Sequence, residues 1–209
     1  MLNLIIKDIY IQKKYVFFLP IILVVYFVTI GSIFNSLVFS LCVGFFAFLM
    51  TIYPTFNTGQ SENNQYKLIL SLPVSRLSVI NAKYLIIILW WLNAYISTTV
   101  ILIILKSIVD INIPSILDIK IILLSLSLTY ILTSIFYPLY FKFGFQIAST
   151  TVTVIFFILT SGLGKLLSLE LKMITILIEH PIISVSFITV IFVLASYLFT
   201  AYSFIKKIL

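Results

Sequence analysis

The stretch from Tyr84 to Leu105, YLIIILWWLNAYISTTVILIIL, contains no charged residue. It has the length and apolarity of a helix that crosses the hydrocarbon core of a bilayer, which takes about 20 residues. The whole chain is similar, because 62% of its 209 residues are hydrophobic and only 9% are charged. A soluble domain has charges at about a quarter of its positions. The composition therefore predicts an integral membrane protein.

Apolar runs of this kind recur along the chain and predict an all-α fold with six transmembrane helices. They cover residues 15–34, 37–56, 84–105, 119–141, 145–163 and 182–205. We expect residues 1–209 to form a single transmembrane domain. On the second run, small residues spaced four apart suit close helix packing within or between subunits; they are Ser36, Ser40 and Gly44.

Charged residues are distributed unequally between the two sides of the predicted membrane. Segments on the side of the N-terminus hold nine basic and two acidic residues, whereas the other segments hold four of each. Lys and Arg favour the cytoplasmic side, so we expect both termini to be cytoplasmic. The net charge of +7 then signals topology and attracts anionic lipid head groups, and we expect no nucleic-acid partner.

Two segments outside the spans are amphipathic. In residues 1–14, apolar side chains recur at helical spacing beside Lys7 and Asp8, which predicts a helix in the inner membrane interface. A frayed polar tail is the alternative. Residues 164–181 combine apolar side chains with Lys165, Glu170, Lys172 and Glu179. We expect these residues to form an extracellular amphipathic segment.

The sequence indicates no catalytic centre, metal site or cofactor site. Ionisable side chains are missing from the middle of every predicted span, whereas ion-coupled carriers usually need them there. The only histidine, His180, lacks neighbouring metal ligands. Residues 162–165 do not complete a nucleotide-binding loop. Energy for uphill transport would therefore have to come from another chain.

The longest polar passage, residues 57–83, separates the second and third predicted spans. Its first part places apolar side chains on one face of a short helix; they are Tyr66, Ile69, Leu70 and Pro73. Pro73 ends this helix, and Ser75 can cap a second helix. That second helix carries Arg76 and Lys83 into the third span. A solvated loop with ordinary positive charge is the alternative.

This passage, ENNQYKLILSLPVSRLSVINAKY from Glu62 to Tyr84, resembles the cytoplasmic loop of ABC-2 type transporter permeases. It is most similar to the small bacterial six-span branch, which works with a separate ATPase and includes exporters of amphipathic peptides. The six-span layout and the N-terminal helix agree with that branch. The residues that carry the resemblance are Glu62, Ser71, Leu72, Pro73, Ser75, Arg76 and Lys83.

The resemblance implies the membrane subunit of an ATP-binding cassette exporter in a bacterial cell membrane. Its partners would be an ABC ATPase, which binds ATP and Mg²⁺, and a second permease copy or a related permease. Residues 62–73 would form the coupling helix, and the N-terminal helix would lie beside it. Arg76 and Lys83 would anchor the loop to the ATPase or to lipid phosphates. The residues assigned to ATPase coupling are Glu62, Tyr66, Leu70, Leu72, Pro73, Arg76 and Lys83.

Polar residues on three predicted spans either line a substrate pathway or form hydrogen bonds between helices. The candidates for a pathway are Asn93, Ser97, Ser127, Tyr130, Ser134 and Thr150. A pathway without charge would suit a hydrophobic or amphipathic cargo, such as a membrane-active peptide. The alternative function is a non-transport scaffold or immunity protein that sequesters such a peptide at the membrane.

Overall fold

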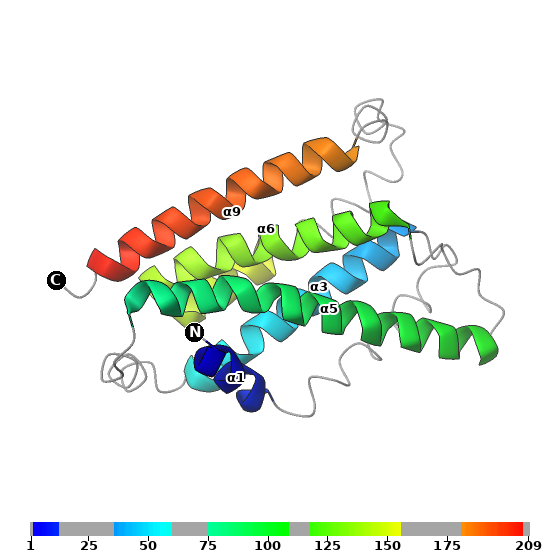
Figure 1. Ribbon diagram of the computed structural model, residues 1–209, viewed down its shortest axis with the longest axis horizontal. Helices are drawn as coiled ribbons and strands as arrows, with labels where there is room; N and C mark the ends of the chain where they lie inside the picture. The colour runs from blue at the N-terminus through cyan, green and yellow to red at the C-terminus, as the bar shows by residue number, and fades with distance from the viewer. Residues whose placement is uncertain (1, 13–35, 60–74, 109–117, 156–180, 207–209) are drawn as a thin grey trace. The chain divides into compact units, whose positions relative to one another are not determined.

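The computed structural model describes residues 2–12, 36–59, 75–108, 118–155 and 181–206 (Figure 1). The secondary structure of these residues is helical throughout, which confirms the predicted all-α class. The helices are α1 (Leu2–Ile11), α3 (Ser36–Gly59), α5 (Arg76–Ile108), α6 (Ile119–Phe143), the unlabelled helix Phe145–Ile155 and α9 (Pro181–Lys206).

Three stretches within the described helices are long and apolar enough to cross a membrane, namely Leu77–Ile104, Ile119–Phe143 and Ser186–Ser203. Two shorter apolar stretches, Phe39–Thr55 and Phe145–Ile155, lie within predicted spans. The predicted first span, the end of the fifth span and the predicted outer segment through residue 180 lie outside the described residues. The number of six spans therefore stays a prediction.

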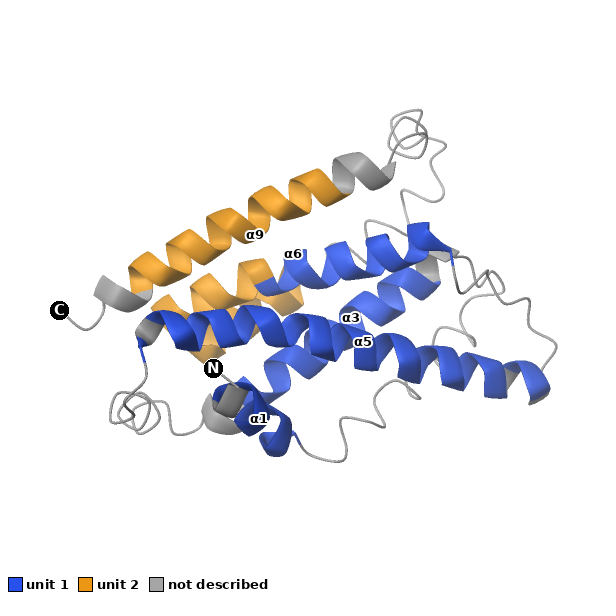
Figure 2. Ribbon diagram, in the orientation of Figure 1, with its two compact units in different colours: residues 1–133 blue, residues 134–209 orange. Residues whose placement is uncertain are grey.

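The chain divides into two compact units, residues 1–133 and 134–209 (Figure 2). The first contains α1, α3, α5 and the first turns of α6, and α3 and α5 run in opposite directions (Figure 1). Its core is built from apolar side chains of α3, α5 and α6. These include Phe39, Val43, Phe46, Met50, Ile86, Trp90, Ala94, Leu102 and Ile121.

A close approach between α3 and α6 lies at Gly44. A Cβ atom on Gly44 would lie 2.6 Å from Cδ2 of Leu128 and 3.0 Å from the carbonyl oxygen of Ser125. The hydroxyl of Thr129 donates a hydrogen bond to the carbonyl of Gly44 at 3.3 Å. Small residues allow such backbone contact in membrane bundles. Gly44 therefore serves packing within the subunit, one of the two roles that its spacing suggested.

A buried hydrogen bond joins α5 to α6. Nε1 of Trp91 donates to the hydroxyl of Ser125 at 3.1 Å, and this hydroxyl in turn donates to the carbonyl of Ile122 at 2.9 Å. An indole N–H in a membrane interior must find its partner within the protein, because hydrocarbon offers none. This bond fixes the rotation of α5 against α6.

The second unit contains the end of α6, the helix Phe145–Ile155 and α9. Gly144 is the single residue between α6 and the helix Phe145–Ile155. It has φ of 93°, and its N–H donates a hydrogen bond to the carbonyl of Tyr140 at 3.0 Å. Glycine adopts such a left-handed conformation at little cost. The hydroxyl of Ser196 in α9 donates to the carbonyl of Ser134 in α6 at 2.7 Å, which links these helices.

We expect Gly44→Ala to lower the thermal unfolding midpoint of the detergent-solubilised protein. Alanine stabilises a helix by about 1 kcal/mol relative to glycine. A loss of stability in this variant would therefore come from the close contact with α6. Unfolding followed by intrinsic fluorescence measures it. The penalty should shrink when Leu128→Ala is also present, because the nearest clashing atom is then missing. A Gly44→Ala protein as stable as the parent would refute this contact.

We expect Trp91→Phe to destabilise the protein by about 1 kcal/mol, because it removes one buried hydrogen bond. Trp90→Phe is the matched control, since Nε1 of Trp90 is buried without a hydrogen-bond partner among the described residues. A double-mutant cycle of Trp91→Phe with Ser125→Ala, read by thermal unfolding, should show coupling. Equal effects of the two tryptophan substitutions would contradict the assignment.

Candidate coupling site

The predicted coupling residues divide between two parts of the chain. Arg76 and Lys83 lie in α5. The others lie outside the described residues, namely Glu62, Tyr66, Leu70, Leu72 and Pro73. The coupling helix at 62–73 therefore stays a prediction, and the structure shows the two helices that flank it: α3, which ends at Gly59, and α5.

The helix α5 begins within the polar passage, at Arg76, directly after the residues that carry the predicted coupling helix and Pro73. Its start is marked by the carbonyl of Ser75, which accepts a hydrogen bond from the N–H of Ser78 at 2.9 Å. The 33 residues of α5 make it about 50 Å long at 1.5 Å per residue, more than the 30 Å or so of a bilayer core. This confirms the prediction of one helix from Arg76 through Lys83 into the apolar run.

Lys83 forms an ion pair with Asp8 of α1. The distance between Nζ of Lys83 and Oδ2 of Asp8 is 2.5 Å, and the two side chains are 17% and 11% exposed. A charge this far from water is stable only with a partner, because the cost of losing its hydration must be offset. Lys83 thus has a partner in its own chain, and its predicted contact with an ATPase or lipid phosphate stays a prediction.

Sequence reasoning missed Asp8 as a functional residue. The available signal was that Asp8 is the only acidic residue before the first predicted span. Nothing in the local pattern points from Asp8 to a lysine 75 positions away. Only the packing of α1 against α5 brings the two charges together.

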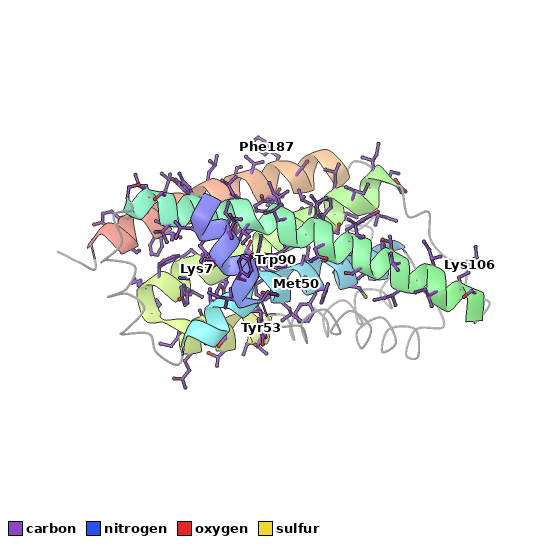
Figure 3. All side chains as sticks on the ribbon, turned by 60° about the horizontal axis from the view of Figure 1, so that its bottom comes forward. Lys7, Met50, Tyr53, Trp90, Lys106 and Phe187 are labelled. Carbon is purple, nitrogen blue, oxygen red and sulfur yellow. The ribbon has the colours of Figure 1, made fainter. Side chains whose placement is uncertain are left out.

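The helix α1 also contacts α3. Nε2 of Gln12, just after α1, donates to the carbonyl of Met50 at 3.5 Å, and Ile5 packs against the core of the first unit. Figure 3 shows α1, which carries Lys7, crossing α3, which carries Met50 and Tyr53, and α5, which carries Trp90. The helix α1 therefore lies across both helices that flank the polar passage.

The face of α1 that points away from α3 and α5 is mostly apolar. Ile6 and Ile9 are about half exposed, Tyr10 is 84% exposed, and Lys7 is exposed beside them, whereas Asp8 is buried. In a soluble protein, such a helix would turn its apolar side chains toward the core and its charged side chains toward water. An outward apolar face flanked by lysine is typical of a helix in a membrane interface. The structure confirms the predicted helix, while its interfacial position stays a prediction.

The predicted pathway residues mostly satisfy their hydroxyls within their own helices. Ser97 donates to the carbonyl of Ala94 at 3.0 Å, Ser127 to that of Leu124 at 2.8 Å, and Thr150 to that of Gln146 at 2.9 Å. Asn93 and Tyr130 are half-buried.

Ser134 differs from these residues, because its Oγ is buried and has no hydrogen-bond partner among the described residues. Residues up to Thr133 belong to the first unit, so Ser134 and Thr150 belong to the second. A common substrate pathway along the six predicted positions therefore stays a prediction.

Within the described ranges, no group of three His, Cys, Asp or Glu side chains could hold a metal ion. Among the described residues, the contacts of α1 beside the predicted coupling region include the ion pair of Asp8 with Lys83, the hydrogen bond of Gln12 and the packing of Ile5. These interactions can position helices against one another.

Comparison with protein families gave a match over residues 3–208 to a family described as ABC-2 family transporter protein. Comparison with curated proteins and with solved structures gave no match. The matched region runs from α1 to the end of α9 and includes the apolar helices described above. The chain therefore belongs to the ABC-2 family of transporter proteins and is a membrane permease.

Proposed function

We propose that this permease is the membrane subunit of an ATP-binding cassette exporter that moves a hydrophobic or amphipathic substrate out of the cell. The observation that carries the proposal is the continuity of α5, which begins within the polar passage at Arg76 and extends over 33 residues into the apolar run. In a chain that belongs to a transporter family over residues 3–208, a rigid helix leading from a polar loop into the membrane is suited to transmit force.

Energy would come from a separate ABC ATPase that binds ATP and Mg²⁺. The coupling helix at 62–73 would seat in this ATPase through Tyr66, Leu70 and Leu72, with Pro73 ending the helix. Closure of the ATPase would displace the coupling helix, and α5 would carry the displacement into the span bundle. Such rigid-body movement is a common way of switching a transporter between inward- and outward-facing states.

The assembly we propose is a dimer of this permease, or a pair with a related permease, in a bacterial cell membrane. Both termini would be cytoplasmic, as the excess of basic residues on their side supports. The outward face of α1 would contact lipid at the inner surface. This arrangement would place the polar passage and the start of α5 on the side of the ATPase.

An amphipathic cargo, such as a membrane-active peptide, is supported by the positions of the charged residues. Within the described helices, charged side chains lie within about two turns of a helix end, and the central turns carry uncharged groups, among them the amide of Asn93. Desolvating a strongly hydrophilic cargo against such a lining would be costly.

We expect the variant Leu72→Asp/Arg76→Glu to lose the ATPase, because it places negative charge on the proposed docking surface. The measurement is affinity purification from mildly solubilised membranes of the host, with the amount of ATPase per permease determined by mass spectrometry. We expect at least a tenfold loss. Lys106→Glu, a charge reversal at the other end of α5, is the matched control and should retain the ATPase.

If the unmodified permease retains no ATPase under these conditions, the exporter proposal fails and a peptide-sequestering scaffold becomes the better explanation. If the double variant retains the ATPase as well as the control does, the polar passage does not form the docking surface.

We expect inverted membrane vesicles that contain the complex to accumulate a fluorescent amphipathic peptide in an ATP-dependent manner. A hydrophilic peptide of equal length and charge is the control, and its uptake should be several-fold lower. Preferential uptake of the hydrophilic peptide would overturn the proposed substrate class while leaving the transport function in place.

A further inference from the structure

We propose that α1 is a brace across the two helices that flank the coupling region, and that the ion pair of Asp8 with Lys83 makes this brace move together with α5. Asp8 and Lys83 are then positioning residues for energy transfer. The inference rests on the proposed function and adds a role for α1 and Asp8 that ATPase docking does not require.

The position of Lys83 is suited to this role. It lies seven residues after Arg76, at which α5 begins, which is about two helical turns. A continuous helix transmits a displacement over that distance with little bending. Movement imposed at the start of α5 therefore reaches Lys83, and through its ammonium group it reaches Asp8.

The environment of the ion pair makes it costly to open. Both side chains are mostly buried, and in a weakly polarisable environment unit charges attract each other far more strongly than in water. Separating them would lose this attraction while both side chains remain mostly withdrawn from water. Movement of α1 together with α5 avoids this cost.

The contacts of α1 define the brace. Gln12 reaches the carbonyl of Met50 in α3, and Asp8 reaches Lys83 in α5. The polar passage begins after α3 ends at Gly59 and leads into α5. The helix α1 thus contacts both α3 and α5, the helices that flank the predicted coupling helix, although it precedes both in sequence.

The ion pair is a direct charged contact between α1 and α5. The hydrogen bond from Gln12 is long, at 3.5 Å, and Ile6, Ile9 and Tyr10 point away from the bundle. A helix of ten residues is too short to be stable in isolation. Removing the pair should therefore loosen α1 from α5 without altering the ATPase-docking residues themselves.

The first test measures the distance between nitroxide labels at Lys7→Cys and Leu77→Cys by pulsed electron paramagnetic resonance. Both positions are exposed, and the full-length protein would carry Cys42→Ser to remove its only cysteine. We expect a narrow distance distribution in this background. Asp8→Asn or Lys83→Gln should at least double its width, and Lys106→Gln is the matched control that should leave it unchanged.

The charge-exchanged variant Asp8→Lys/Lys83→Asp separates ion pairing from a general folding defect. We expect it to restore the narrow distribution, because the two charges attract each other in either order. Single substitutions that leave the distribution as narrow as the background would overturn the proposal. If both single variants broaden the distance distribution and the exchanged variant does not narrow it again, the ion pair is not what holds α1 to α5.

The second test uses the complex with its ATPase, trapped with ATP and vanadate. The distance between the two labels should stay constant on trapping when the ion pair is intact, and it should change in Asp8→Asn. The Asp8→Asn variant should also retain the ATPase but lose most ATP-dependent transport. A changed distance with the pair intact would overturn joint movement. Absence of the ATPase from the parent complex would refute the proposed function instead, and the first test would still decide whether the pair holds α1 to α5.

Discussion

In the hydrocarbon core of a bilayer, a polar group that finds no hydrogen-bond partner within the protein has none at all. Several polar side chains of the described helices meet this constraint, whereas Nε1 of Trp90 and Oγ of Ser134 are buried without a partner among the described residues. Thr51, Thr98 and Thr133 each donate their hydroxyl to the carbonyl four residues earlier in the same helix. The indole of Trp91 instead uses Ser125 of the neighbouring helix. Polar side chains therefore decide which helix faces meet, and the apolar residues fill the space between them.

The same constraint explains the arrangement of α1. Asp8 could face water in a soluble protein, but here it is buried against Lys83, and the outward face of α1 carries isoleucine and tyrosine. Pairing within the chain neutralises two charges that would be costly beside lipid. It also ties an N-terminal helix to the start of α5.

Much of the fold could be predicted because an apolar run of sufficient length has few alternatives to a helix in a membrane. The predicted run at 84–105 lies within α5, yet α5 begins eight residues earlier, at Arg76. Hydropathy marks where a helix enters lipid. The first residue of a helix is set instead by backbone hydrogen bonding, which begins here at the carbonyl of Ser75. The coupling loop and the helices beside it were predicted from polarity, motif and apolar runs, but the side chains that join α1 to α3 and α5 could be identified only from the structure.

The sequence by itself determined the membrane class, the helical fold, the apolar segments and the permease family, because composition, run length and motif are local properties of the chain. Only the tertiary structure decided that Gly44 packs against α6, that Trp91 and not Trp90 has a hydrogen-bond partner among the described residues, and that Asp8 pairs with Lys83. Each of these depends on the rotation of one helix against another. That rotation is fixed by side chains far apart in the sequence meeting at distances of a few ångströms, which no local pattern encodes.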